Sequence, residues 1–164
     1  MRRALAPVAL ALCLASGGWA LASCGYALST RWVGKGGLEK VEVRLFQNRS
    51  TEPALGTVVT DALRAGLARR GALAASTEGS ARLEGEVGAR QPTASSADAK
   101  TWHIGIEVRA RLLAGAEVAA EGTFAREVDY LAGGDPVESE GRRALALRRL
   151  AEELAPEILA AFER

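Results

Sequence analysis

Cys24 is the residue of this chain whose surroundings most clearly predict a chemical reaction. The residues Leu-Ala-Ser precede it, and Met-Arg-Arg opens the chain with positive charge. Between the two, an uncharged apolar run covers about residues 4–14. That run is too short to span a bilayer and has the layout of a secretory signal. A thiol placed directly behind such a signal is well placed for covalent modification after export.

The tetrapeptide Leu-Ala-Ser-Cys at residues 21–24 resembles the lipobox of bacterial lipoproteins. In that family the cysteine is acylated and becomes the first mature residue. The resemblance implies that residues 1–23 are a lipoprotein signal peptide and that Cys24 is the lipidation site. More than one acyl chain makes such an anchor effectively stable. Gly25 stands where enterobacterial lipoproteins kept at the inner membrane have aspartate, so the outer membrane is indicated.

An ordinary secreted protein is the alternative interpretation, because Ala-Leu-Ala at residues 20–22 also fits a signal-peptidase site. The two cysteines argue against it. Cys13 would be lost with the signal, and Cys24 would remain as a lone free thiol in an oxidising compartment, which is unusual. Lipidation gives that thiol a use.

No other set of side chains has the spacing of a catalytic or metal site. His103 is the only histidine, and a metal or catalytic role would need partner residues at defined spacing. The carboxylates of Asp98, Asp129 and Asp135 show no such pattern. The glycine-rich segments 34–37 and 85–88 lack the context of a nucleotide-binding loop. We therefore expect no enzyme activity, no metal and no cofactor.

Composition indicates one domain of ordinary size. Removing residues 1–23 from the 164-residue chain leaves 141 residues, enough to bury a core. Two of the 21 basic residues lie in the signal, so 19 remain against 20 acidic residues. This balance gives no electrostatic case for nucleic acid. We expect a lipidated tether at residues 24–38, flexible at its glycine-rich end, and a single domain at residues 39–164.

Alternating apolar and polar residues predict four strands, at residues 39–46, 81–90, 101–112 and 117–130. A fifth, short strand is expected at residues 72–76. In the strands at residues 81–90 and 101–112, apolar residues occupy one face and the charged residues occupy the other. The charged residues would therefore share the outer face of a sheet.

Two apolar stripes at helical spacing predict helices that cover the inner face of that sheet. The first helix should begin at an N-cap at Ser50 or Thr51 and close at Gly71 behind two arginines. The second should begin at Asp135, with a proline at its first position, and end near Phe162. Its apolar spacing continues in register through Pro156, which favours a kink over a break.

One sheet with both helices on one face buries all these apolar surfaces. The expected fold is α+β, a two-layer sandwich with one mostly antiparallel sheet of four to five strands. The polar outer face stays solvated or available to a partner. In this arrangement Arg90, Lys100 and the loop at residues 131–136 should converge at one end of the sheet.

Three segments together resemble the LPS-assembly lipoprotein family. They are Cys-Gly-Tyr-Ala-Leu at residues 24–28, the strand at 41–46, and Asn-Arg-Ser-Thr-Glu-Pro at 48–53 opening a helix. The later order of strands and terminal helix matches too. The resemblance implies a domain that sits inside a large outer-membrane β-barrel partner, acts there as plug and assembly factor, and contacts lipopolysaccharide. The lipid anchor would hold it to the membrane.

In that family, basic residues near the loops at one end of the sheet meet the anionic lipid. Here the loops at residues 91–99 and 131–137 contain no lysine or arginine. The candidate lipopolysaccharide contacts are the flanking cations, Arg90, Lys100, Arg142 and Arg143. Cations beside phosphates would be favourable, and the alternative is that these are solubilising loop charges.

Two other functions stay open. One is a periplasmic lipoprotein that regulates a cell-wall synthase or serves a curli-type secretion system, because such proteins also combine a strand, an Asn-rich turn and an amphipathic helix. Glu52-Pro53 and Gly25-Tyr26 favour lipopolysaccharide assembly over this function. The other is a periplasmic enzyme, against which the missing site residues count.

Overall fold

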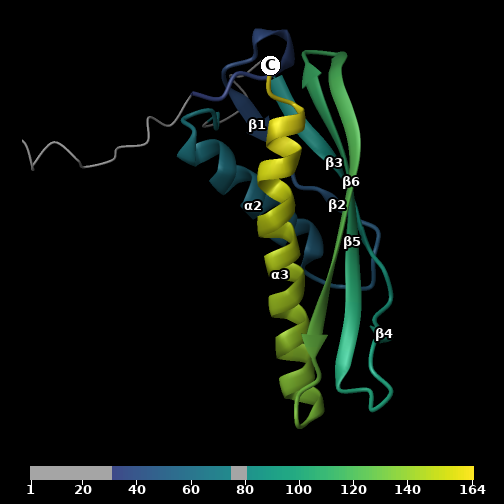
Figure 1. The fold of residues 1–164 in the computed structure, drawn as a ribbon. Coiled ribbons are helices and arrows are strands. Elements are labelled where there is room, and N and C mark those ends of the chain that lie inside the picture. The colour runs from purple at the N-terminus through teal and green to yellow at the C-terminus, as the bar shows by residue number, and fades with distance from the viewer. Residues whose placement is uncertain (1–30, 75–80) are drawn as a thin grey trace, which may run out of the picture.

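The computed structural model describes residues 31–74 and 81–164, which form two layers (Figure 1). One layer is a six-stranded sheet and the other is a pair of helices. In chain order the elements are the 3-10 helix η2 Lys35–Gly37, β1 Val41–Val43, β2 Gln47–Asn48, α2 Leu55–Arg69, β3 Ala81–Ala89, β4 Thr93–Ala94, β5 Thr101–Ala114, β6 Glu117–Leu131 and α3 Pro136–Ala161. The predicted α+β class is confirmed. The predicted signal peptide and Cys24 lie outside the described residues.

The sheet is mixed, where the sequence predicted four to five mostly antiparallel strands. β5 pairs antiparallel with β3 and β4 on one side and with β6 on the other. β1 and β2 both pair parallel with β3. β2 and β4 are two residues long, so each is too short for alternation of apolar residues to reveal it.

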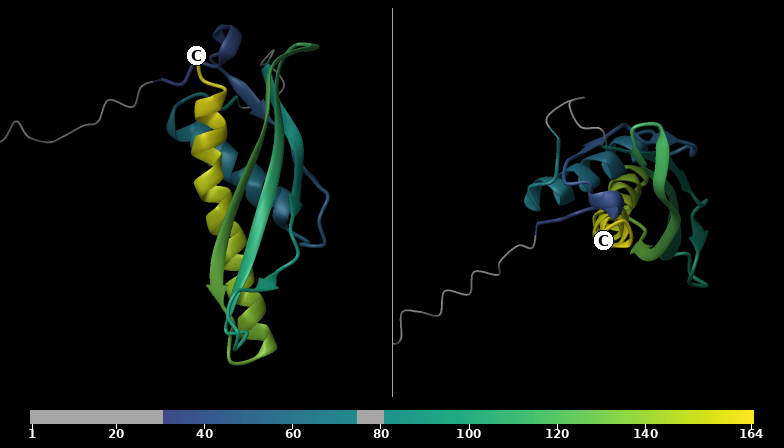
Figure 2. Two further views of the ribbon diagram at one scale, coloured as in Figure 1. Left: turned by 45° about the vertical axis from the view of Figure 1, so that its right-hand side comes forward. Right: turned by 90° about the horizontal axis from the view of Figure 1, so that it is seen from above.

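The core lies between the sheet and the helices, both of which cover one face of the sheet (Figure 2). The inward positions predicted for β3 and β5 are buried or partly buried. They meet the stripes predicted for the helices. The fully buried aliphatic side chains of this layer include Leu55, Leu63, Leu67, Leu83, Ile104, Ile106, Leu112, Leu150 and Leu154. None of the described helices combines the length and apolar character needed to cross a membrane.

The strand predicted at residues 39–46 is interrupted, because an aromatic side chain takes the buried position. Leu45 is 64% exposed and Phe46 is 1% exposed, the reverse of the predicted alternation. The buried hydroxyl of Thr60 in α2 accepts a hydrogen bond from the Phe46 amide at 3.0 Å. A larger apolar side chain gains more from burial, so the backbone turns between β1 and β2 to bury it.

The first helix begins later than predicted, and its cap is not Ser50 or Thr51. Helix α2 starts at Leu55 after Ala54, which makes no side-chain capping bond. The polar side chains upstream are used in a turn: Asn48 Oδ1 accepts from the Ser50 amide at 2.9 Å, and Asn48 Nδ2 donates to the Glu52 carbonyl at 2.6 Å. Such local bonds compete with helix capping.

The end of α2 agrees with the prediction. Gly71 has a φ of 64°, the left-handed conformation that favours glycine. Its amide donates to the Ala68 carbonyl at 3.0 Å, and the amide of Ala72 donates to the Leu67 carbonyl at 2.9 Å. These two bonds are the Schellman arrangement that ends a helix.

The packed domain begins before residue 39, in the part of the expected tether that the structure describes. Trp32 is 1% exposed, and its indole Nε1 donates to the Leu159 carbonyl at 2.9 Å. The Lys35 amide donates to the Phe162 carbonyl at 2.9 Å. Residues 31–38 are therefore attached to the end of α3. Burial of the tryptophan ring there lowers the free energy by more than the loss of conformational entropy in this segment raises it.

Helix α3 passes through Pro156 as one helix of 26 residues. The proline lies on the exposed side, where water can satisfy the carbonyl that loses its intrahelical donor. At its start, the Asp135 Oδ1 accepts from the Glu138 amide at 2.8 Å, as the predicted cap requires.

Candidate functional site

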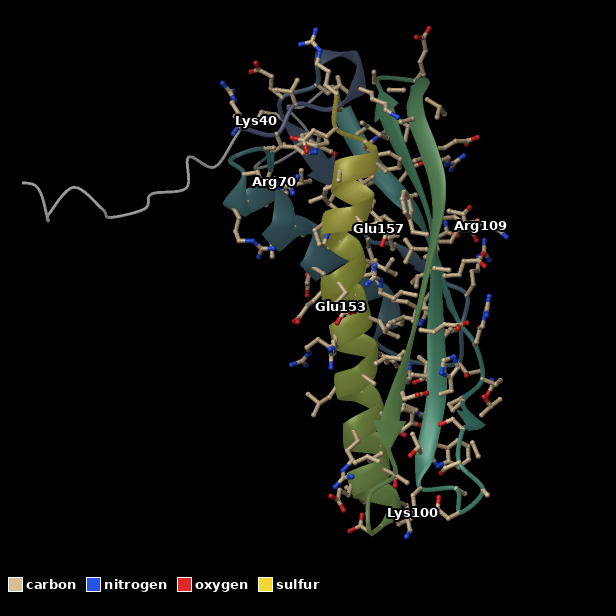
Figure 3. The ribbon with its side chains drawn as sticks, in the orientation of Figure 1. Lys40, Arg70, Lys100, Arg109, Glu153 and Glu157 are labelled. Atoms are coloured by element: carbon tan, nitrogen blue, oxygen red, sulfur yellow. The ribbon has the colours of Figure 1, made fainter. Side chains whose placement is uncertain are left out.

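The outer face of the sheet is covered by charged side chains that pair across strands. Arg49 lies 2.8 Å from Glu86, and Arg111 lies 3.1 Å from Glu84. Arg109 points away from the helices (Figure 3). Exposed pairs of this kind contribute about 0–1 kcal/mol each to stability. Their main consequence is a polar face of mixed sign.

This outer face is hollowed beside the connection between β1 and β2. The hollow has a volume of ≈ 840 Å³. Its polar lining residues are Arg44, Gln47, Glu84, Glu86, Arg109, Arg111, Glu121 and Thr123. Within residues 31–74 and 81–164, no group of three or more His, Cys, Asp or Glu residues could hold a metal ion. The arrangement suits docking against another polar surface.

The loop end of the domain is the end that holds the β5 start, the β6 end and the α3 start. The predicted convergence of Lys100 with the loop at residues 131–136 occurs there, and Arg142 also reaches this loop. The Lys100 carbonyl accepts from the Ala132 amide at 2.7 Å, and the Arg142 guanidinium donates to the Ala132 carbonyl at 2.9 Å. Figure 3 shows Lys100 at the opposite end from Lys40 and Arg70.

Arg90 does not converge with Lys100. The Arg90 amide donates to the Gly105 carbonyl at 2.9 Å, whereas Lys100 directly precedes β5. The two cations are thus separated by about five residues along the strand, or roughly 17 Å. After β3 the chain continues beside β5 as β4, opposite Trp102 and His103, and only then turns into β5 at the loop end.

Arg142 and Arg143 are held by acidic side chains of the domain itself. Arg142 lies 2.5 Å from Glu138. The Gly134 amide and the Arg142 guanidinium hold the pKa of Glu138 below its usual value. Arg143 lies 2.7 Å from Glu140 and 3.5 Å from Glu52. Both arginines therefore fix the loop end in place, which their sequence position alone did not reveal.

Arg90 and Lys100 are the accessible members of the predicted set. Their side chains are 64% and 80% exposed. Arg90 pairs with Glu127, and Lys100 lies 3.3 Å from Asp98. A hydrogen bond from the Ser96 hydroxyl and one from the Lys100 amide lower the pKa of Asp98. An anionic ligand would have to compete with these carboxylates for the two cations.

A second hollow, of ≈ 480 Å³, lies at the loop end beside Arg143. It is lined by Pro92, Ala99, Trp102, Tyr130, Ala132, Ser139 and Arg143. The alternation within residues 101–112 predicts an inward position for Trp102, and the only sign of a different role in the sequence is its place next to a polar loop. Glu52 was not among the predicted site residues, and it is 7% exposed and lies 3.5 Å from Arg143.

His103 lies on the outer face between two carboxylates. Its Nδ1 is 2.8 Å from Asp129, and its Nε2 is 3.1 Å from Glu127, which also pairs with Arg90. Hydrogen bonding to Asp129, and then to Glu127, raises the pKa of His103 above its ordinary value. The imidazole is 40% exposed, so solvent screens these interactions.

The raised pKa predicts a pH-dependent effect of His103→Gln on stability. A raised pKa in the folded state stabilises the domain below the unfolded pKa of about 6.5, and that stabilisation disappears as the pH rises through the folded pKa. The variant should be less stable than the wild type at pH 5 and indistinguishable at pH 9. Urea unfolding at both pH values measures this.

His103→Ala should leave function nearly unchanged at neutral pH, and a large loss of function with folding intact would overturn the expectation of no enzyme activity.

Comparison with known proteins identifies one family. The family model LptE, described as lipopolysaccharide-assembly, matches residues 38–162. No curated protein sequence matches the chain.

Several solved structures share the fold. A lipoprotein from Caulobacter crescentus CB15 superposes with a TM-score of 0.59 at 17% identity, covering 77% of this chain and 89% of that one. A minor lipoprotein from Acinetobacter baumannii gives 0.53 at 15% identity, with coverages of 76% and 90%. The rare lipoprotein B from Shewanella oneidensis gives 0.50 at 12% identity, with coverages of 73% and 91%. At identities this low, the superpositions show a common fold alone.

Proposed function

The chain belongs to the LptE lipopolysaccharide-assembly family, and from this membership we propose that it is the lipoprotein subunit of an outer-membrane lipopolysaccharide-exporting β-barrel. In this role it would act without catalysis, as a plug and assembly factor held to the outer membrane through acylated Cys24. The single observation that carries the proposal is the family match over residues 38–162.

The outer sheet face supports the plug role. Barrel interiors are polar, and a domain that fills one must present polar groups of both signs. The 840 Å³ hollow and its surrounding cross-strand pairs present such groups over β3, β5 and β6. Because each exposed pair contributes little alone, complementarity would come from the whole face.

The shape of the domain supports a lengthwise position in the barrel. Residue 31 and the C-terminus lie at one end, and the loop end lies at the other (Figure 2). Helix α3, with 26 residues, gives a length of roughly 39 Å, comparable to the bilayer core of about 30 Å. A tether of residues 24–30 reaches at most about 25 Å. The loop end therefore extends away from an anchor at Cys24.

Lipopolysaccharide contact is proposed at the loop end and along the adjoining strand. Arg90 and Lys100 would meet lipid phosphates directly, because they are the exposed cations of the predicted set. Arg142 and Arg143 would contribute from positions fixed by Glu138, Glu140 and Glu52. Charge-assisted bonds to phosphate are favourable.

Reversing Arg90 and Lys100 together should weaken lipopolysaccharide binding and leave the fold unchanged. At about 1 kcal/mol for each exposed charge, the two reversals together cost about 2 kcal/mol, a roughly thirtyfold loss of affinity, and added salt should reduce the difference. The double variant Arg90→Glu, Lys100→Glu is compared by equilibrium binding with the wild type. A matched control, Lys35→Glu with Arg82→Glu, changes the same charge at the other end of the domain. Equal affinities of the two double variants would remove the lipid-site assignment.

The partner is tested by photocrosslinking in cells from position 109 or 123, which line the outer-face hollow. The expected product joins the lipoprotein to a large outer-membrane β-barrel protein. A product with a peptidoglycan synthase would replace this proposal with the cell-wall alternative. Absence of any barrel product from both positions would contradict the plug role.

A further inference from the structure

The outer edge of β6 presents a long row of backbone groups that no strand pairs with. β6 pairs only with β5, and its other side borders no strand among residues 31–74 and 81–164. The opposite edge of the sheet is formed by β1 and β2, which are three and two residues long. β6 has 15 residues, so it is the extended edge of this sheet.

The register identifies which backbone groups are free. The Ala132 amide donates to the Lys100 carbonyl, so the pair Thr101–Leu131 is a non-hydrogen-bonded pair of the antiparallel ladder. Such pairs alternate, and the members on β6 direct both N–H and C=O away from β5. The Arg90 amide bond to Gly105 on the other side of β5 fixes the same alternation independently. The residues with free backbone groups are Glu121, Thr123, Ala125, Glu127, Asp129 and Leu131.

All six of these residues are exposed. No hydrogen bond within the described residues reaches their backbone N–H or C=O on the outer side. From Glu121 to Leu131 the edge has no proline and no register shift, and it extends roughly 34 Å. Proteins commonly block such edges with proline, bulges, very short strands or charged side chains; between Glu121 and Leu131 this edge has only the last of these.

Helix α3 covers the inner face of β6 without covering its edge. Arg126 lies on that inner face and reaches α3, 2.9 Å from Glu157 and 3.6 Å from Glu153. Figure 3 shows both glutamates on α3. A partner would therefore meet the backbone edge, with side chains on the outer face beside it.

We propose that the outer edge of β6 is a β-augmentation site that takes an extended, basic strand of another protein. Free N–H and C=O groups at alternate residues recognise an extended polypeptide by backbone hydrogen bonds. The outer-face side chains beside them include Glu121, Glu127 and Asp129. Glu127 pairs with Arg90 and His103, and Asp129 pairs with His103, so a lysine or arginine of the incoming strand would share these carboxylates, while Glu121 makes no ion pair within the described residues. This inference goes beyond the proposed function and does not depend on it.

A second copy of this chain fits the edge less well than a basic strand. In an antiparallel pair of β6 strands centred on residue 125, Glu121 lies opposite Asp129. Centred on residue 127, the pair places Glu127 opposite its own copy. Like charges directly opposite are destabilising. A pair centred on residue 126 avoids them by placing Thr123 opposite Asp129, but it offers no cation to Glu121, Glu127 or Asp129, whereas a basic strand does.

The test uses the acylated mature chain in detergent micelles and an eleven-residue probe peptide. The peptide alternates threonine with lysine or valine, and its three lysines lie opposite Glu121, Glu127 and Asp129 in antiparallel register. Without peptide, the six free amides should exchange with solvent quickly, and the amides between them slowly. Saturating peptide should slow exchange at the six amides by about tenfold or more, with little change at the amides between them.

Ala125→Pro removes one free-edge donor and leaves the bonds between β6 and β5 in place. It should weaken peptide binding about tenfold, the equivalent of one lost hydrogen bond. Ala125→Ser keeps the amide and should bind as the wild type does. A second copy as the true occupant would appear as protection of the six amides that rises with protein concentration in the absence of peptide. Such concentration-dependent protection would overturn the proposal. So would equal protection of all β6 amides by the peptide, no protection at all, or unchanged peptide binding by Ala125→Pro.

Discussion

Leu63→Asp is expected to unfold the domain. Leu63 is completely buried in the middle of α2, between the sheet and α3. A carboxylate there would have no partner, and an unpaired buried ion costs several kcal/mol against a total stability of about 5–15 kcal/mol. Protonation of the carboxyl would reduce the cost without removing it, because the cavity left by leucine would remain.

The measurement is circular dichroism with urea unfolding of the purified variant. Ala65→Asp is the matched control, because it places the same carboxylate two residues further along α2 at an exposed position. The control should unfold at nearly the wild-type urea concentration. A cooperative transition for Leu63→Asp close to that of Ala65→Asp would contradict the buried position of this helix face.

Cys24→Ala is expected to move the protein from the membrane to the periplasm. The proposed anchor is covalent lipid on this thiol. Several acyl chains bind the membrane stably, and a chain without the thiol carries no acyl chain and so has no anchor. Nearly all of the protein should therefore change fraction. Subcellular fractionation followed by immunoblotting measures it, together with mass spectrometry of the acyl chains on the wild type.

Cys13→Ala is the control for this prediction. It removes the other cysteine of the chain, which lies within the proposed signal, and should leave acylation and fractionation unchanged. Fractionation is done in cells without the barrel partner, since the partner could retain the domain by itself. A Cys24→Ala protein that stays in membranes at wild-type levels under these conditions would contradict the lipoprotein interpretation.

Long elements with one buried face were predictable from the sequence. β3, β5, β6 and both helices repeat apolar residues at a period that matches their structure, because each buries one side against one layer. The ends of the helices at Gly71 and Asp135 were also predictable, since their conformation and capping depend on adjacent residues. The family resemblance was carried by the same local pattern and agrees with the match over residues 38–162.

Positions that depend on distant residues were not predictable. Trp32 belongs to the core because the end of α3 offers it a carbonyl partner 127 residues away. The exchange of Leu45 and Phe46 depends on Thr60, and the register shift between Leu112 and Leu113 leaves Val118 49% exposed on a strand side predicted to face inward. Each outcome depends on which side chain fills a given volume, and the volume exists only after the layers pack.

The candidate site divides in the same way. By itself the sequence determined that the outer sheet face is charged and that the cations Arg90, Lys100, Arg142 and Arg143 flank two loops. Only the tertiary structure decided that Arg142 and Arg143 are held by Glu138, Glu140 and Glu52, while Arg90 and Lys100 stay exposed and apart. Alternation places a side chain on a face through local backbone geometry. Its partner and its distance from another cation are fixed by strand pairing and by helix packing, which join residues far apart in the chain.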